Sequence, residues 1–535
     1  MLAKDAYNQL EPTQWAETPV VERLSLIEEI QDNLLKFMDD LGNVDSSMKN
    51  QLTAEGAVSF GEGAGTTVNP MGMTLLGIRR LYESLVHGEL PKPVNVTPLG
   101  DDTFEVEVYP VHKKDKLMAA KMKGYLHIKG TPEQVHPLDK PAGIIAVSGA
   151  GNYSSSIEMV MALFLENKAV IHKPHQLNEA TDKVWEKVFA PLIKRKALVF
   201  IDADQGHEMA ALNGLHSIYF TGSTGVAHAI QDAASAPLVS ECGGNNPCLI
   251  VPGIKPWTEK EIDRWAMQIV SAGKLNGGAV CGRPQTIITS KSWPQREQFI
   301  AALRNAMTKV TFAVTTYYPS IDKTKAAFIE NQPTAEILKP EDGKNPYGDV
   351  IFIPGISKDD FAIKNEAFCQ LFSELPLETE NDADDFLTKA TEFCNTKLLG
   401  SLGCMVLVDN DTLKQKKERV HQAVQELNYG GIAVNNIPPN IWLNPYLTWG
   451  GCGETTENFV SGVGNFGNGL NFNNIIKSVI IDDFTAMTFA LTNKIQFEHL
   501  LVNASKFSVH QSWGHFVKLA GQMVIDGICP KNNKN

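Results

Sequence analysis

Between residues 143 and 230 the chain alternates short, wholly apolar runs with segments whose apolar residues recur at helical spacing. The runs predict buried strands and the segments between them predict helices. Apolar strands that alternate with helices are typical of βαβ units in a parallel sheet, where ligands bind at the carboxyl ends of the strands. The predicted strands cover 143–147, 169–171, 197–201 and 217–220. The predicted helices cover 155–166 and 181–194, and a third helix opens at the loop 221–225 and runs through Ile230.

The same order of elements returns after Glu241. An apolar strand over 249–251 precedes a helical pattern over 258–272, and a strand over 286–289 follows. The repeat predicts a second α/β domain behind the first.

A different pattern, in which single apolar and polar residues alternate, marks residues 103–109 and continues over 125–128. Alternation with period two predicts half-buried antiparallel strands, which do not fit the middle of a nucleotide-binding unit and suggest a protruding β-arm. A β-branched strand over 475–481 is a candidate to pair with this arm.

The ends of the chain are less informative. Helical spacing predicts helices from Thr18 to about Leu41 and over 73–86, whereas the glycine-rich stretch 50–69 predicts a loop. The tail after residue 484 is rich in apolar residues, and the pattern assigns it no role.

Composition narrows the classes of function. The 535 residues are enough for two or three domains, and 43% hydrophobic with 20% charged residues is typical of a soluble globular protein. A net charge of −13 argues against nonspecific nucleic-acid binding, which needs Lys and Arg. The N-terminus has no apolar signal region, and the chain has no run of about 18 apolar residues. The eight cysteines repeat no metal-ligand spacing, so we expect a cytoplasmic protein with reduced thiols and no metal.

Two glycine-rich loops carry the main candidate chemistry. Cys281 lies between Gly278 and Gly282, and Glu241 lies forty positions upstream, immediately before the sequence Cys-Gly-Gly-Asn. A thiolate is a nucleophile, a carboxylate can act as a base, and N–H groups of a glycine-rich loop can hold an oxyanion. Cys281 is equally compatible with a small buried residue, because cysteine is often buried.

Four further positions are ambiguous when each is considered alone. Asn152 suits an oxyanion or a turn, and the loop 221–225 suits phosphate at a helix N-terminus or a tight βα connection. Lys173, just after a strand, suits a ribose hydroxyl or the solvent. Glu366 and Phe368 suit a clamp on ribose and nicotinamide or an ordinary loop.

Taken in their order along the chain, these motifs resemble the aldehyde dehydrogenase superfamily. The resemblance runs from about residue 24 to 481, is weak before Gly143 and is absent from the last fifty-odd residues. The motifs are Asn152, Lys173-Pro174, Phe220-Thr-Gly-Ser-Thr, Glu241-Cys-Gly-Gly-Asn-Asn-Pro247, Asn276-x-Gly-x-x-Cys281 and Glu366-x-Phe368.

The resemblance implies an α/β fold with three parts and a tail. These are a Rossmann-like cofactor domain (1–115 and 140–243), a catalytic α/β domain (244–465), a small β-arm for oligomerisation (116–139 and 466–483) and an extension of unknown role (484–535). It also implies a homodimer or homotetramer.

The resemblance also implies the chemistry of an NAD- or NADP-dependent enzyme. Cys281 would attack the aldehyde carbon, Asn152 and the backbone N–H of Cys281 would hold the oxyanion, and hydride transfer would leave a thioester. Glu241 would activate water to release a carboxylic acid.

The cofactor contacts are implied in the same way. Glu366 would bond the nicotinamide ribose with Phe368 beside the ring, Lys173 would bond the adenosine ribose, and Gly222 with Ser223 would meet the pyrophosphate. The resemblance also implies that Gly243, in the loop after Glu241, contacts the cofactor.

Several departures indicate a divergent branch. Gln176 stands where many NAD-preferring members have Glu, which leaves NADP use open. Gly278-Ala279 replaces the usual Gly-Gln, Asn245 stands where Lys is common, and Cys369-Gln370 follows Phe368 in place of Gly-Pro.

The substrate is the least defined feature. We expect a tunnel near Tyr153, Val280 and the apolar segment 436–449, which favours a medium or long apolar aldehyde, although these residues also fit a core. One alternative is a CoA-acylating aldehyde dehydrogenase or an acyl reductase, relatives that usually lack the glutamate at position 241. Another is a binding protein that keeps the fold without activity.

Overall fold

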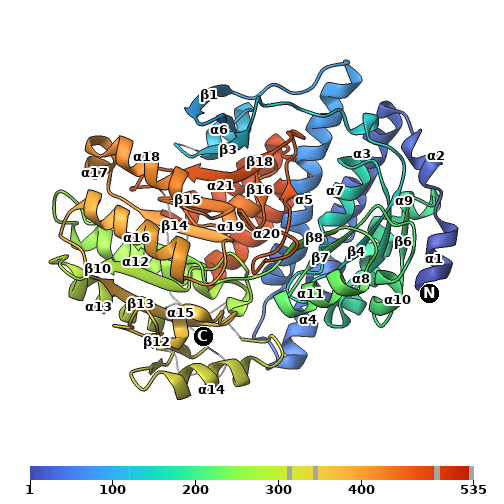
Figure 1. Cartoon of the computed structure of the whole chain (residues 1–535). Helices are drawn as coiled ribbons and strands as arrows, with labels where there is room; N and C mark the ends of the chain where they lie inside the picture. Colours follow the sequence, from blue (N-terminus) through green and yellow to red (C-terminus); the bar gives the residue numbers. More distant parts are fainter. Residues whose placement is uncertain (120, 310–315, 342–347, 487–493, 529–535) are drawn as a thin grey trace.

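A computed structural model describes the chain except for residues 120, 310–315, 342–347, 487–493 and 529–535. It contains two large sheets side by side, with the five-stranded sheet on the right of Figure 1 and the eleven-stranded sheet on the left. The α/β fold class predicted from the sequence is confirmed.

The five-stranded sheet is parallel throughout, with the order β6-β5-β4-β7-β8. The chain leaves β4 in one direction and later returns to its other side, so the strand order reverses between β4 and β7. Such a switch point opens a crevice at the carboxyl ends of the strands. The strands are β4 (Ile144–Ser148), β5 (Ala169–Lys173), β6 (Leu198–Phe200), β7 (Ser217–Thr221) and β8 (Leu238–Glu241).

Helices cover both faces of this sheet, because successive apolar side chains of β4 and β5 point to opposite faces. Ile145 and Val147 pack against one helical layer, and Ile144 and Ala146 pack against the other. The first layer contains α3 (Val20–Lys36), α5 (Phe60–Val86), α7 (Glu158–Phe164), α8 (Glu179–Val188) and α9 (Ala190–Lys194), and the second contains α1 (Ala3–Gln9), α10 (Gly206–Ala210) and α11 (Thr224–Ala233).

The eleven-stranded sheet has the order β1-β2-β3-β18-β15-β14-β9-β10-β13-β12-β11 and is parallel from β18 to β12. The predicted pairing of the β-arm with the late strand is confirmed, because β3 and β18 are antiparallel neighbours. The strands are β1 (Asn95–Gly100), β2 (Thr103–Tyr109), β3 (Lys123–Lys129), β9 (Pro247–Ile250), β10 (Thr286–Ser290), β11 (Glu336–Leu338), β12 (Val350–Ile353), β13 (Leu371–Leu377), β14 (Gly403–Leu407), β15 (Gly431–Val434) and β18 (Ile475–Ile481).

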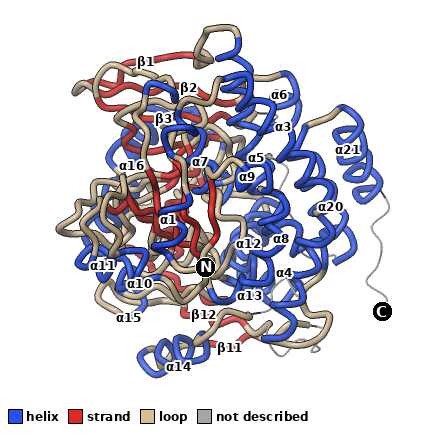
Figure 2. Tube along the Cα trace, turned by 90° about the vertical axis from the view of Figure 1, so that its right-hand side faces the viewer, coloured by secondary structure: helices blue, strands red, loops and turns tan. Residues whose placement is uncertain are grey.

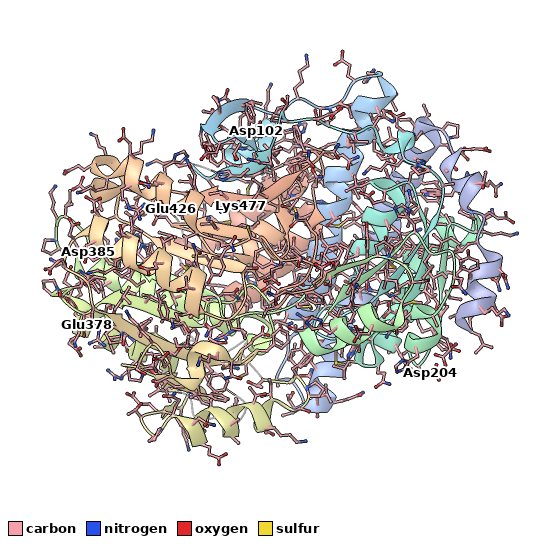
Figure 3. All side chains as sticks on the ribbon, in the orientation of Figure 1. Asp102, Asp204, Glu378, Asp385, Glu426 and Lys477 are labelled. Carbon is pink, nitrogen blue, oxygen red and sulfur yellow. The ribbon has the colours of Figure 1, made fainter. Side chains whose placement is uncertain are left out.

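Helices α12 (Glu259–Lys274) and α13 (Arg296–Lys309) pack on one face of this sheet, and α16 (Ala383–Lys397) and α18 (Lys417–Glu426) pack on the other. The buried Lys477 of β18 donates to the carbonyls of Gln425 and Leu427 at the end of α18, where a cation is favourable. Figure 3 shows Lys477 within the ribbon, whereas the labelled Asp102, Asp204 and Glu378 stand at the periphery.

The smaller elements complete the order along the chain. The helices are α2 (Pro12–Ala16), α4 (Met38–Leu52), α6 (Lys113–Ala119), α14 (Ile321–Asn331), α15 (Phe361–Lys364), α17 (Asn410–Gln415), α19 (Pro439–Trp442), α20 (Lys494–His510) and α21 (Trp513–Ile528), the 3-10 turns are η1 (Pro137–Asp139), η2 (Gln176–Asn178) and η3 (Leu275–Gly278), and a two-stranded ladder joins β16 (Thr448–Trp449) to β17 (Phe466–Gly467).

The loop predicted over 50–69 is wrong for most of its length. Helix α4 runs to Leu52, and α5 begins at Phe60 behind a Ser59–Glu62 capping box. The glycines lie there because helices meet closely: a Cβ on Gly63 would lie 2.2 Å from the carbonyl oxygen of Gly42. The helix predicted from Thr18 to Leu41 is likewise two helices, α3 and α4, joined at Phe37.

The tail without an assigned role forms α20 and α21, which lie at the right-hand edge of Figure 2. Helix α20 packs along α5, where a Cβ on Gly65 would lie 3.0 Å from Leu501. The carboxylate of Glu498 accepts from the Gly61 N–H at 2.7 Å and from the Ser59 hydroxyl, so it caps the start of α5.

Across the described residues, no helix has both the length and the apolar character that a bilayer crossing requires. The domain boundaries expected from the resemblance stay a prediction.

Candidate active site

A cavity of about 580 Å³ lies at the carboxyl ends of the five-stranded sheet, and we call it the sheet-end cavity. Four strand ends supply its walls, because each predicted motif on this sheet follows a strand or ends one. The predicted site residues that line it are Asn152, Lys173, Gly222, Ser223, Glu241, Gly243, Cys281, Glu366 and Phe368.

Gln176 is the predicted site residue that does not line the sheet-end cavity. It is exposed at the start of η2, and its neighbour His175 lines the cavity instead. The bearing of Gln176 on the choice between NAD and NADP therefore stays a prediction.

The loop that carries Cys281 has a left-handed backbone over three residues. Asn276, Gly277 and Gly278 have φ values of 50°, 68° and 83°, a conformation that glycine and asparagine tolerate best. A Cβ on Gly278 would lie 2.4 Å from the carbonyl carbon of Cys369. The cysteine loop is therefore pressed against the backbone that follows Phe368, which brings the two motifs together.

Cys281 differs from the other cysteines that the structure describes, because they are buried and it keeps partial solvent access. Cys529 lies outside the described residues. Burial of its surroundings and the negative charge of the neighbouring Glu241 raise the pKa of the Cys281 thiol well above its ordinary value. The thiol is thus protonated at rest and needs a nearby proton acceptor to become a nucleophile.

Glu241 is such an acceptor. Its side chain is 4% exposed at the end of β8, and its Oε1 atom has no hydrogen-bond partner among the described residues. The pKa of Glu241 is raised to about 8, mainly by burial; a hydrogen bond with the thiol of Cys281 opposes the shift, and the charges of Glu158 and Glu366 add to it. A carboxyl group with this pKa exchanges a proton near neutral pH.

Asn152 connects the first sheet to the cysteine loop. Its side-chain N–H donates to the carbonyl of Ala279 at 3.1 Å, and its own carbonyl accepts from the Asn276 side chain at 3.0 Å. An amide carries two N–H donors, so one stays available to a ligand. The backbone N–H of Cys281 also has no hydrogen-bond partner within the described chain.

A space of about 20 Å³ lies among Asn152, Tyr153, Glu241, Cys281 and Trp442. This volume accommodates about one water molecule. The Cys281 thiol, a candidate for nucleophilic attack, and the Glu241 carboxyl, a candidate for proton transfer, therefore border the same small space.

The other end of the sheet-end cavity suits a dinucleotide. Ser223 is the N-cap residue of α11 and makes no side-chain capping bond, so the N–H groups of Thr224 and Gly225 at the start of the helix are available to phosphate. Lys173 ends β5 and its ammonium donates to the Pro174 carbonyl at 3.0 Å.

Glu366 and Phe368 stand together in this cavity. A Cβ on Gly243 would lie 2.0 Å from the Glu366 carboxylate, so a larger residue there would displace the Glu366 side chain. Burial raises the pKa of Glu366 to about 7, against a backbone hydrogen bond from Gly244 and the charge of Arg283. Phe368 meets Tyr318 edge to face at 5.2 Å between ring centres.

The motifs missed Glu158, His175 and Tyr318. Glu158 borders the space around Cys281 and accepts from the Thr221 hydroxyl at 3.1 Å. In the sequence, Glu158 is a single acidic residue directly before the apolar run 159–165, and this position could have marked it as a candidate. Tyr318 and His175 line the sheet-end cavity, and no spacing in the sequence marks them.

A second cavity of about 150 Å³, which we call the helix-lined cavity, lies between α5, α12, α19 and α20. Tyr153 and Trp442, whose ring centres are 4.8 Å apart, line both this cavity and the space around Cys281. Of the segment predicted to line a tunnel, Ile437, Trp442 and Leu443 do so. The same prediction is wrong for Val280, Tyr446, Leu447 and Trp449, which are buried outside the cavity walls.

Comparisons with known proteins identify the relatives. The model of the aldehyde dehydrogenase family matches residues 119–337. The chain is 21% identical over 375 residues to aldehyde dehydrogenase family 3 member A2 of Macaca fascicularis, covering 67% of this chain and 71% of that one.

Solved structures share the fold at low identity. One is an NADP-dependent glyceraldehyde-3-phosphate dehydrogenase from Bacillus halodurans C-125, complexed with NADP, with a TM-score of 0.63 at 14% identity over 90% of this chain and 91% of that one. Another is a mutant of aldehyde dehydrogenase C from Pseudomonas syringae, complexed with NAD+ and octanal, with a TM-score of 0.63 at 14% identity over 91% and 90%.

Proposed function

We propose a function for a chain that belongs, as a divergent member, to the aldehyde dehydrogenase superfamily: oxidation of an aldehyde to a carboxylic acid with NAD or NADP. The observation that carries the proposal is the space that Cys281 and Glu241 share beside the sheet-end cavity. In the overall reaction, aldehyde, oxidised cofactor and water give acid, reduced cofactor and one proton.

The first half of the reaction belongs to Cys281. Its proton passes to Glu241, and the thiolate sulfur bonds to the carbonyl carbon of the aldehyde. The free N–H of Asn152 and the backbone N–H of Cys281 hold the oxygen that becomes negative. Glu366 and Phe368 would hold a nicotinamide cofactor, which would supply the hydride acceptor for that carbon and so leave the substrate as a thioester on the sulfur.

The second half belongs to Glu241. Glu241 first releases to solvent the proton that it took from Cys281, which is the proton of the overall reaction. Its carboxylate then takes a proton from a water molecule, whose oxygen bonds to the thioester carbon. The carbon–sulfur bond breaks, and the proton passes from Glu241 to the sulfur and restores the thiol. The unpartnered Oε1 atom supports this role, because a buried carboxylate oxygen without a partner can bind a water proton. The space of about 20 Å³ beside it is of the right size.

The same carboxylate favours hydrolysis over transfer to CoA. A CoA-acylating enzyme needs no water-activating base at this position, because the thiol of CoA displaces the enzyme sulfur. The CoA alternative is therefore an outcome that the experiment must be able to detect.

For the substrate, we propose an aliphatic aldehyde of medium length, because apolar residues of α19 and α20 line the helix-lined cavity. A cavity of about 150 Å³ admits a group about the size of benzene. We further propose a cytoplasmic homodimer or homotetramer that assembles through the β-arm, whose edge strand β1 is largely exposed.

The test follows the absorbance of reduced nicotinamide over a panel of aldehydes, with NAD and with NADP, and with and without CoA. We expect turnover without CoA, an acid as product, and a loss of at least about 10⁴-fold in Cys281→Ala. Cys394→Ala, which removes a buried thiol of α16 outside the site, is the matched control and should keep wild-type rates. Equal rates for wild type and Cys281→Ala, or a requirement for CoA with acyl-CoA as product, would contradict the proposal.

A further inference from the structure

We propose that the helix-lined cavity recognises a hydroxyl group on the chain of the substrate, through Gln268 and Ser271 of α12. The inference rests on the proposed function for the reacting end of the substrate. It adds the chemical class of the other end of the substrate: an aliphatic chain that carries a hydroxyl group, in place of an unsubstituted chain.

Gln268 and Ser271 are polar side chains in a cavity with largely apolar walls. They are three residues apart on α12, so they lie on the same face of the helix. Both line the cavity, at 5% and 2% exposure. Their Oε1 and Oγ atoms are buried, and neither has a hydrogen-bond partner among the residues that the structure describes.

Ser271 stands out against the other helical hydroxyls near this cavity. A serine or threonine inside a helix commonly donates to the carbonyl three or four residues earlier. Thr66 of α5, which lines the same cavity, does so to Glu62 at 3.1 Å. Ser271 makes no such bond, so its hydroxyl stays available to whatever fills the cavity.

A buried polar atom without a partner destabilises a fold, and ligand binding can remove this penalty. Gln268 Oε1 only accepts, whereas Ser271 Oγ can donate. A hydroxyl group fits both at once, because its proton goes to Gln268 and its oxygen accepts from Ser271. A ketone oxygen satisfies Ser271 alone, and a methylene group satisfies neither.

The site lies away from the reacting carbon. Gln268 and Ser271 line the helix-lined cavity and not the space around Cys281, and Tyr153 with Trp442 stands between the two. Phe497 and Leu500 of α20 add apolar surface to the same cavity. The hydroxyl group therefore belongs on the chain, several carbons from the aldehyde.

The test compares kcat/KM for octanal, for octanals with a single hydroxyl at the sixth or the seventh carbon, and for the matching ketones. We expect at least one hydroxyl position to raise kcat/KM about tenfold or more over octanal, and the ketone at that position to give a smaller gain. Gln268→Leu and Ser271→Ala should each remove most of the hydroxyl preference, so that the ratio of kcat/KM for the hydroxylated octanal to kcat/KM for octanal approaches one.

The matched control is Thr391→Val. Thr391 also has a buried hydroxyl without a partner, but it lies on α16 outside the cavity. This variant should keep the full hydroxyl preference. A wild type that oxidises octanal and its hydroxylated forms equally well at every position overturns the inference, and so does a preference that survives both α12 substitutions.

A binding measurement separates this inference from the proposed function. Calorimetry on the full chain without cofactor compares 1-octanol with the octanediol that carries the favoured second hydroxyl. A diol preference that Ser271→Ala removes supports the hydroxyl site even if no aldehyde is oxidised, in which case the proposed function alone fails. Aldehyde oxidation with equal binding of the two alcohols overturns the hydroxyl site alone.

Discussion

The two cavities on either side of the space around Cys281 are built in different ways. The sheet-end cavity takes its walls largely from loops that follow strands, and all but one of its predicted residues sit in short motifs that line it. The helix-lined cavity takes its walls from α5, α12, α19 and α20, which are spread between residues 60 and 510. Local sequence thus predicts the residues of the proposed chemistry, whereas the walls of the proposed substrate cavity depend on long-range helix packing.

The largest expected effect falls on the sheet-end side. Glu241→Gln keeps the shape of the site but removes the base, so steady-state turnover should fall about 10³-fold. Formation of the thioester should be slower, because the Cys281 thiol must then give its proton to water, but it should still reach one turnover. Rapid-mixing absorbance should show a slowed burst of reduced nicotinamide of about one equivalent per site, and a variant without any burst would show that the thiol cannot react without Glu241.

The backbone of the cysteine loop should be nearly as sensitive. Gly278→Ala combines a φ of 83° with a Cβ 2.4 Å from Cys369, so we expect at least about tenfold lower activity and a loss of ~2 kcal/mol or more in the free energy of unfolding. Gly355→Ala is the matched control, since Gly355 has a φ of 71° and open space around it. Urea unfolding curves compare the two variants. Equal losses would show that the left-handed backbone, and not the contact with Cys369, requires glycine at 278.

The helix-lined side should respond in selectivity rather than in chemistry. Leu501→Ala on α20 removes apolar surface from the cavity, so kcat/KM for octanal should fall about tenfold while kcat/KM for acetaldehyde stays unchanged. Val502→Ala changes the next residue of the same helix, which is outside the cavity walls, and should affect neither substrate. An equal loss for both aldehydes would mean that α20 supports the fold of the site and not the substrate.

The smallest expected effect is a pH dependence. Because Glu241 must be deprotonated to activate water, the rate of acid release should rise with pH and level off above its pKa of about 8. The folded state holds this proton up to about pH 8, against an ordinary pKa of 4.5, so stability should fall as pH rises between these values. Stopped-flow rates and thermal melts of wild type and Glu241→Gln measure both, and an unchanged profile in the variant would assign the titration to another group.

The contrast between the cavities also explains what the sequence could predict. Cys281, Glu241 and Asn152 were found because each lies in a short loop beside a recognisable strand or in a familiar order. Gly61, Gly63 and Gly65 were misinterpreted, because a glycine that lets two helices touch has the same local sequence signature as a loop. The Glu498 cap and the cavity wall from α20 depend on a contact across more than 430 residues, which no local pattern encodes.

The most direct test of the central claim is the mass of the enzyme during one turnover. Glu241→Gln is mixed with excess octanal and cofactor, quenched in acid, and measured as intact protein and as peptides. The account predicts a mass increase equal to one octanoyl group, located on Cys281 and absent from Cys281→Ala. Nicotinamide reduction with no adduct on Cys281 would contradict it.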